Sequence, residues 1–289
     1  MSRSRLIFSV VVVLLGVAAV ALINVWQADG SKEIHQRLAN VDQALRSAGS
    51  ARVTFNAEIK PQVSGPSATL QGTSMIKFGD TADWDTTYSS IVADGKAPIQ
   101  AHGVRVGQDT YFSSPSMEPE DGRSWFTAET PAAWGGLFAD PRLGLGDFTV
   151  WNEFLADTTE ANAFDGATDE LPDVDGAEHE YKIRCTPQQD AGCPPPFDSG
   201  LDDVFDQAVY QRMSAWIDDE GRVRKLEVDL SVIYAGDDGS YAPTPDHPYG
   251  EYFAKMTFTL DEFGTPVTVT APPDDQITQS RVVGISQPG

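Results

Sequence analysis

The stretch MSAWIDDEGRVRKLEVDLSVI, residues 213–233, decides the fold class of this chain. From Val223 to Ile233 apolar and polar residues alternate, and this period of two is typical of a strand with one buried and one solvated face. Turn-forming residues, Asp218-Asp219-Glu220-Gly221, precede that strand. The stretch therefore predicts an antiparallel hairpin in which Met213 to Ile217 pairs with Val223 to Ile233.

The same alternation recurs on both sides of the hairpin. Val53, Phe55, Ala57 and Ile59 alternate with polar residues, so a strand is expected from residue 51 onward. Further runs predict strands at 70–78, 83–88, 99–106, 110–113, 177–184 and 256–260. A turn at 261–264 then leads into 266–270. Each run has one apolar side, which is typical of an antiparallel sheet with one wet face.

Four segments have the spacing of helices. Between residues 31 and 48 the apolar residues recur at intervals of three and four, with Ser31 as a possible N-cap and Gly49 at the expected end. Shorter helices are expected at 134–138, at 147–156 with Asp147 as its N-cap, and at 201–208. Helices combined with at least seven antiparallel strands predict the α+β class.

The N-terminus predicts a membrane anchor. Leu6 to Trp26 contains 21 residues without a charge, enough for a helix to cross a hydrocarbon core of about 30 Å. Arg3 and Arg5 precede it, so the remainder is expected outside the cytoplasm. A cleavable signal peptide is the alternative, with a cleavage site at Ala19-Val20-Ala21. Both interpretations predict an exported domain.

Charge and cysteine content agree with export. The chain of 289 residues has a formal net charge of -23, which repels nucleic acid and anionic lipid head groups and so disfavours the binding of polyanions. Its only two cysteines, Cys185 and Cys193, enclose a polar loop and predict a disulfide. Their spacing does not match that of a redox or zinc motif.

Catalytic and cofactor motifs are absent from the sequence. His35, His102, His179 and His247 stand in unrelated contexts, outside any nucleophile or zinc-protease motif. The glycine-rich segments match no phosphate-binding loop. The acidic stretch at 173–176 lacks the ligand spacing of a calcium loop. We therefore expect neither an enzyme nor a resident metal or cofactor.

Two blocks of sequence resemble a known family. Trp216 to Leu226, together with Phe263-Gly264-Thr265-Pro266-Val267 and the residues that follow, is similar to the C-terminal half of LppX/LprG-type lipoproteins of actinobacteria. These proteins belong to the LolA-like superfamily. The helix followed by Ser50 to Phe55, and later Val106 to Phe112, also fits this pattern. The chain departs from the family because it has no lipobox cysteine and because 129–175 matches nothing in it.

The resemblance implies an antiparallel sheet curled into an unclosed half-barrel, with helices on its concave side and an apolar cavity for acylated lipids between them. On this basis we expect a domain at 31–275, after the anchor at 1–30 and before a polar tail at 276–289. The apolar faces of the strands supply the candidate cavity residues, which are Phe55, Ile76, Trp84, Tyr88, Leu226, Leu230, Met256 and Phe258.

The sequence thus favours a membrane-anchored, extracytoplasmic protein that binds a lipid or another apolar ligand. The same residues could instead fill a closed core, because alternation predicts burial and not a cavity. In that case the domain would act as a sensor or interaction module for a protein partner in the cell envelope. An open cavity would favour the first function, and an exposed apolar patch the second.

Overall fold

A computed structural model describes residues 36–61, 67–93, 96–119, 121–127, 141, 146–157, 174–185, 207–233, 251–278 and 282–285. Its helices are α2 (Val41–Ala48), α3 (Phe148–Asp157) and the 3-10 turn η4 (Asp274–Gln276). The strands are β1 (Ser50–Pro61), β2 (Ala68–Lys77), β3 (Asp83–Ala93), β4 (Ile99–Val106), β5 (Asp109–Ser113), β6 (Met117–Pro119), β7 (Trp125–Thr127), β8 (His179–Cys185), β9 (Gln207–Ile217), β10 (Val223–Ile233), β11 (Glu251–Asp261), β12 (Ile277–Thr278) and β13 (Val282–Ile285).

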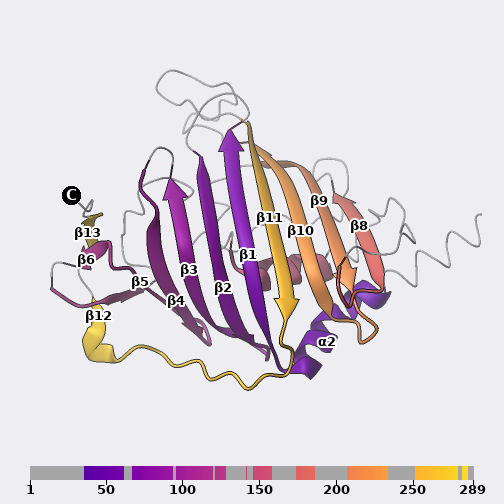
Figure 1. The fold of residues 1–289 in the computed structure, drawn as a ribbon, viewed down its shortest axis with the longest axis horizontal. Coiled ribbons are helices and arrows are strands. Elements are labelled where there is room, and N and C mark those ends of the chain that lie inside the picture. The colour runs from indigo at the N-terminus through magenta and orange to yellow at the C-terminus, as the bar shows by residue number, and fades with distance from the viewer. Residues whose placement is uncertain are drawn as a thin grey trace, which may run out of the picture.

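One large sheet dominates the fold (Figure 1). Its eleven strands follow the order β12-β7-β5-β4-β3-β2-β1-β11-β10-β9-β8, and its two end strands do not pair with each other. All neighbours are antiparallel except β12 and β7. The expected α+β fold with an unclosed sheet is therefore confirmed. A separate two-stranded ladder joins β6 to β13.

The sheet consists of two meanders that meet at β1 and β11. Strands β1 to β5 follow one another on one side, and β8 to β11 follow one another on the other. Arg52 of β1 lies opposite Asp261 of β11, and two hydrogen bonds of 2.8 and 2.9 Å join their side chains on the outer face. Residues from the two ends of the domain thus form the centre of the sheet.

Alternation along the strands separates an apolar face from a polar one. Ala51, Val53, Phe55, Ala57 and Ile59 of β1 are all buried, whereas Thr54 and Asn56 between them are exposed. Strands β2, β3, β10 and β11 repeat this pattern in register with β1. We call the apolar side the inner face, because α3 packs against it, and the other side the outer face.

Helix α2 covers one end of the inner face. Val41 and Leu45 of this helix are fully buried, as is Leu38 just before it, in agreement with the helical spacing. The helix ends at Gly49, whose positive φ of 82° suits a glycine. The expected uninterrupted helix was wrong in one respect, because a turn at Asn40 separates residues 36–39 from α2. Asparagine has a low helix propensity, which agrees with this interruption.

Of the remaining predictions, one is corrected by the structure and the others fall outside the residues that it describes. The helix expected at 201–208 was wrong at its end, because Gln207 already begins β9; the β-branched and aromatic residues that follow favour a strand there. Residues 134–138, Cys193 and the side chain of Cys185 lie outside the described residues, as does the predicted anchor at 6–26. No helix within the described ranges is long and apolar enough to span a bilayer.

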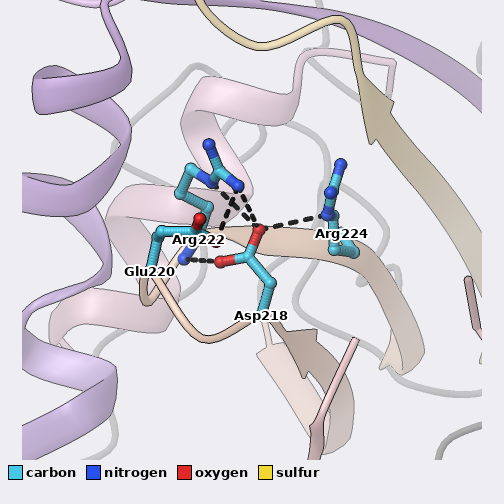
Figure 2. Close-up of polar contacts among 4 residues, drawn as sticks. All are labelled: Asp218, Glu220, Arg222 and Arg224. Carbon is cyan, nitrogen blue, oxygen red and sulfur yellow. Dashed lines mark hydrogen bonds and ion pairs between the residues drawn. The ribbon is translucent and has the colours of Figure 1, made fainter. Parts of the chain in front are cut away.

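A buried carboxylate fixes the hairpin between β9 and β10 (Figure 2). Asp218 is only 4% exposed and accepts hydrogen bonds of 2.9 Å from the backbone N–H and from Nε of Arg222. Arg224 Nε lies 3.1 Å from the same carboxylate. Both guanidinium groups also lie against the ring of Phe263, with their Cζ atoms 4.6 and 4.9 Å from its centroid. Charged hydrogen bonds therefore hold the turn that the sequence predicted.

An extended strap returns from the centre of the sheet to its far edge. After β11, Gly264 donates a backbone hydrogen bond of 3.0 Å to Ser50, and the chain then runs past the ends of the strands to η4 and β12 (Figure 1). There Ile277 and Thr278 pair with β7, and Arg123 donates to the carbonyl of Ile277 at 2.5 Å. The strap thus connects the middle of the sheet to one of its edges.

Candidate ligand-binding face

The structure brings all eight predicted cavity residues onto the inner face. They come from β1, β2, β3, β10 and β11, each is at most 4% exposed, and all belong to one apolar cluster: Phe55, Ile76, Trp84, Tyr88, Leu226, Leu230, Met256 and Phe258. Direct cross-strand pairs join Ile76 to Trp84, Phe55 to Phe258 and Phe258 to Leu226. Burial follows from their position on one face, as alternation predicts.

The segment before α3 packs closely on the centre of this face. A methyl group at Gly146 would lie 2.5 Å from Cε2 of Phe55, and one at Gly72 would lie 2.7 Å from Cζ of the same ring. The Phe55 ring also meets Tyr88 edge to face at 5.5 Å. A short distance further along the chain, Phe148 meets Phe258 in the same way at 5.8 Å. Gly72 therefore makes room for the Phe55 ring within the sheet, and Gly146 allows the start of α3 to approach that ring.

Polar groups lie beside the start of α3. Asp147 Oδ1 accepts hydrogen bonds from the backbone N–H and the hydroxyl of Thr149 at 2.9 and 2.7 Å, which confirms Asp147 as the N-cap. Burial raises the pKa of the Asp147 carboxyl above its usual value. The bonds from Thr149, the charge of Arg105 and the indole of Trp84 each favour the ionised form and oppose that shift.

Arg105 places a cation on the inner face. It lies directly across from Trp84 in the β3–β4 ladder, and residues paired in this way share a face. Its Nε donates to the carbonyl of Gly107 at 3.2 Å. The indole nitrogen of Trp84 is buried and makes no hydrogen bond of normal geometry within the described part of the chain, although it lies close enough to Asp147 to favour the ionised carboxyl. Sequence analysis missed this cluster, although Arg105 interrupts the apolar side of 99–106.

Thr86 and Ser74 form a second polar feature of the inner face. Both are buried, and a hydrogen bond of 2.7 Å from Thr86 Oγ1 to Ser74 Oγ joins them across β2 and β3. Because the hydroxyls bind each other, their burial costs little free energy. On α3, by contrast, the side-chain oxygen of the buried Asn152 has no hydrogen-bond partner among the described residues. Unpaired buried acceptors are uncommon in folded proteins.

An open cavity of about 500 Å³ lies at the edge of the sheet, away from the eight predicted residues. It is formed by the turn after β5 and the segment that enters β7, and it is lined by Ser113, Ser114, Pro115, Met117, Gly122, Arg123 and Ser124. Arg123 is held there by Asp121 at 3.5 Å and by the carbonyl of Ile277. The short elements that form this cavity have too few residues to produce a sequence pattern.

The fold and this face define an α+β protein whose large open sheet carries α2 and α3 on an apolar inner face. Neither a known family model nor a curated protein matches the chain. Among solved structures it is similar to LprF from Mycobacterium bovis, with 11% identity, a TM-score of 0.43, and coverage of 83% of this chain and 97% of that one.

Two further solved structures are similar to the chain. Lipoprotein LppX from Mycobacterium tuberculosis has 14% identity and a TM-score of 0.32, over 81% of this chain and 98% of LppX. A LolA superfamily protein from Nitrosomonas europaea has 11% identity and a TM-score of 0.30, over 84% of this chain and 96% of that one. These are the kinds of protein that the sequence motifs resemble.

Proposed function

We propose that this chain is a non-enzymatic, membrane-anchored protein that binds a lipid or another apolar ligand outside the cytoplasm. The ligand lies between the inner face of the sheet and the helices that cover it. The eight inner-face residues named above form the apolar wall of its cavity. The segment at 6–26 holds the domain at the membrane, where an apolar ligand is taken up or released.

The observation that carries this proposal is one continuous apolar row across the sheet. From β8 to β3 the residues in direct register are Tyr181, Ala215, Leu226, Phe258, Phe55, Gly72 and Tyr88. With strands about 4.8 Å apart, seven residues extend over about 29 Å. A row of this length offers contact along an acyl chain, and each buried methylene contributes about 0.8 kcal/mol.

The polar outer face weighs against the alternative, a sensor that binds a protein partner through an apolar surface. Among the described residues, the only large apolar side chain that is strongly exposed is Phe253 on β11, at 49%. Its register partners, Lys60 and Ser231, are polar. Single exposed apolar residues are common on soluble proteins, whereas partner-binding patches are contiguous. Ligand binding on the inner face is therefore the better supported function.

A native mass spectrum of the full chain, extracted in detergent from its own host, tests the proposal together with lipid analysis. We expect a reproducible adduct whose mass matches an extracted lipid. If the chain carries no adduct and takes up none of the host lipids when they are added back, ligand binding is excluded and a protein partner becomes the next candidate.

A pair of variants locates the ligand. Ala57 is buried on the inner face next to Met256, whereas the neighbouring Asn56 is exposed on the outer face. Ala57→Leu adds volume where the ligand is expected, so the adduct should weaken while Asn56→Leu leaves it unchanged. In a close-packed core without a cavity, Ala57→Leu would instead cost about 1–3 kcal/mol of stability. Thermal unfolding of both variants separates these results.

A further inference from the structure

Arg105 is a cation on the apolar inner face that lies near the Asp147 carboxyl without forming an ion pair with it. Its described hydrogen bond uses only Nε, and a guanidinium has five N–H donors. Within the described ranges no carboxylate forms an ion pair with it, although the charge of Arg105 is close enough to Asp147 to favour ionisation of that carboxyl. A partly buried cation is costly unless further acceptors surround it. Arg105 therefore has donors available for an oxygen-bearing group.

Trp84 adds a second donor beside Arg105. The residue is 4% exposed, and its indole nitrogen makes no hydrogen bond of normal geometry with the described residues. The ring is held in place, because Gly103 leaves just enough room for it: a methyl group there would lie 3.0 Å from the Trp84 ring and 3.1 Å from that of Phe112. A buried indole N–H usually has a partner. The position of the ring is thus fixed, and its N–H lies close enough to the Asp147 carboxyl to favour the ionised form of that group.

Asp147, the N-cap of α3, lies beside Arg105 and Trp84. Both of its hydrogen bonds from Thr149 go to Oδ1. Burial raises the pKa of this carboxyl, so its protonated form is favoured relative to an exposed aspartate and can donate a hydrogen bond of its own. The three side chains come from β3, β4 and the start of α3, and together they present donors to one small region of the inner face.

We propose that Arg105, Trp84 and Asp147 bind the anionic, oxygen-bearing end of an acyl lipid, whose hydrocarbon chain lies along the apolar inner face. The lipid oxygens accept hydrogen bonds from the Arg105 guanidinium and the Trp84 indole. The protonated Asp147 carboxyl donates a third hydrogen bond to them. This inference rests on the proposed function and adds the class of ligand and its orientation.

Photo-labelling of the full chain in detergent tests the site. The probes are a fatty acid that carries a photoreactive diazirine and an alkyne tag, and the methyl ester of the same molecule. Both enter an apolar cavity, but only the acid has an anionic end for Arg105. The ratio of acid to ester labelling is compared among the wild type, Arg105→Gln, Trp84→Phe and Arg52→Gln. Arg52 is the matched control, since it is an arginine of the same sheet that is paired with Asp261 on the outer face.

We expect the labelling ratio to favour the acid in the wild type and in Arg52→Gln. It should fall about tenfold in Arg105→Gln, as expected for the loss of a charged hydrogen bond, and severalfold in Trp84→Phe, which keeps the ring and removes the N–H. Unchanged labelling by the ester shows that both variants are folded. An equal ratio in Arg105→Gln and Arg52→Gln would overturn the head-group site while leaving ligand binding intact. If neither probe labels the wild type above a detergent-only background, ligand binding itself fails and the site with it.

Discussion

The contact between Gly146 and Phe55 makes a sharp prediction about the position of α3. In Gly146→Ala the new methyl group would lie 2.5 Å from Cε2 of Phe55 and 3.0 Å from two further ring atoms. Carbon atoms pack best at about 3.5–4.0 Å, so the segment or the ring has to move by about 1 Å. Overpacking of this kind costs about 1–3 kcal/mol.

A double-mutant cycle isolates this contact. Phe55→Leu removes the outer ring atoms that the new methyl group would contact too closely. This change also lowers the free energy of unfolding by itself. In the background of Phe55→Leu, the change Gly146→Ala should therefore cost much less, which gives a coupling free energy of about 1–2 kcal/mol between the two changes. Urea unfolding followed by tryptophan fluorescence measures all four proteins, because Trp151 of α3 and Trp84 of β3 are both buried in the folded state.

Additive effects of the two substitutions on the free energy of unfolding would contradict a contact between Gly146 and Phe55. If Gly146→Ala costs the same, within about 0.5 kcal/mol, in the presence and absence of the Phe55 ring, the two residues do not touch. The start of α3 would then not lie on the centre of the sheet, and the polar site beside it would lose its third member. A change in the denaturant slope of one variant would show altered exposure on unfolding and would have to be excluded first.

Three further predictions follow from buried or clustered carboxylates. Asp218→Ala should lower the free energy of unfolding by about 2–4 kcal/mol in the same assay, since it leaves two arginines without their shared partner. The raised pKa of Asp147 means that the folded state holds the proton of this carboxyl more tightly than the unfolded state does, so the stability that the proton contributes is lost as pH rises from about 4 through the folded pKa. The free energy of unfolding of the wild type relative to Asp147→Asn should therefore decline along a series from pH 5 to pH 8. A flat or rising difference would contradict this. The hydrogen bond and charge of Asp219 raise the pKa of Glu178, so Glu178→Gln should unfold at a higher temperature than the wild type at pH 8, with a smaller advantage at pH 5; no pH dependence would show that the two carboxyls do not interact.

Local patterns in the sequence predict the strands and their buried side well, because one apolar face must be excluded from water. All eight inner-face residues followed from alternation alone, and Asp147 and Gly49 followed from helix-end chemistry. The elements that were missed, β6, β7, β12 and β13, have two to four residues each, which is too few to establish a period. Their pairing depends on tertiary contacts.

The polar site could not be predicted for a different reason. Arg105 and Trp84 become neighbours only through the register of β3 with β4, and Asp147 joins them only because Gly146 lets the chain approach Phe55. Each residue has an ordinary local explanation as a strand or cap residue. Their combination depends on contacts between segments separated by many residues, and no local pattern encodes these.

The central position of β1 has a consequence for folding during synthesis. Its partner β11 lies far along the chain, with Arg52 and Asp261 separated by 209 residues. Until that strand emerges, β1 presents an unpaired apolar edge, and such edges recruit other chains. Closing so long a loop is slow, which lengthens the period of exposure. A domain with this connectivity reaches its folded state only after nearly all of it has been synthesised, so chaperones that bind extended apolar segments have their main opportunity at β1.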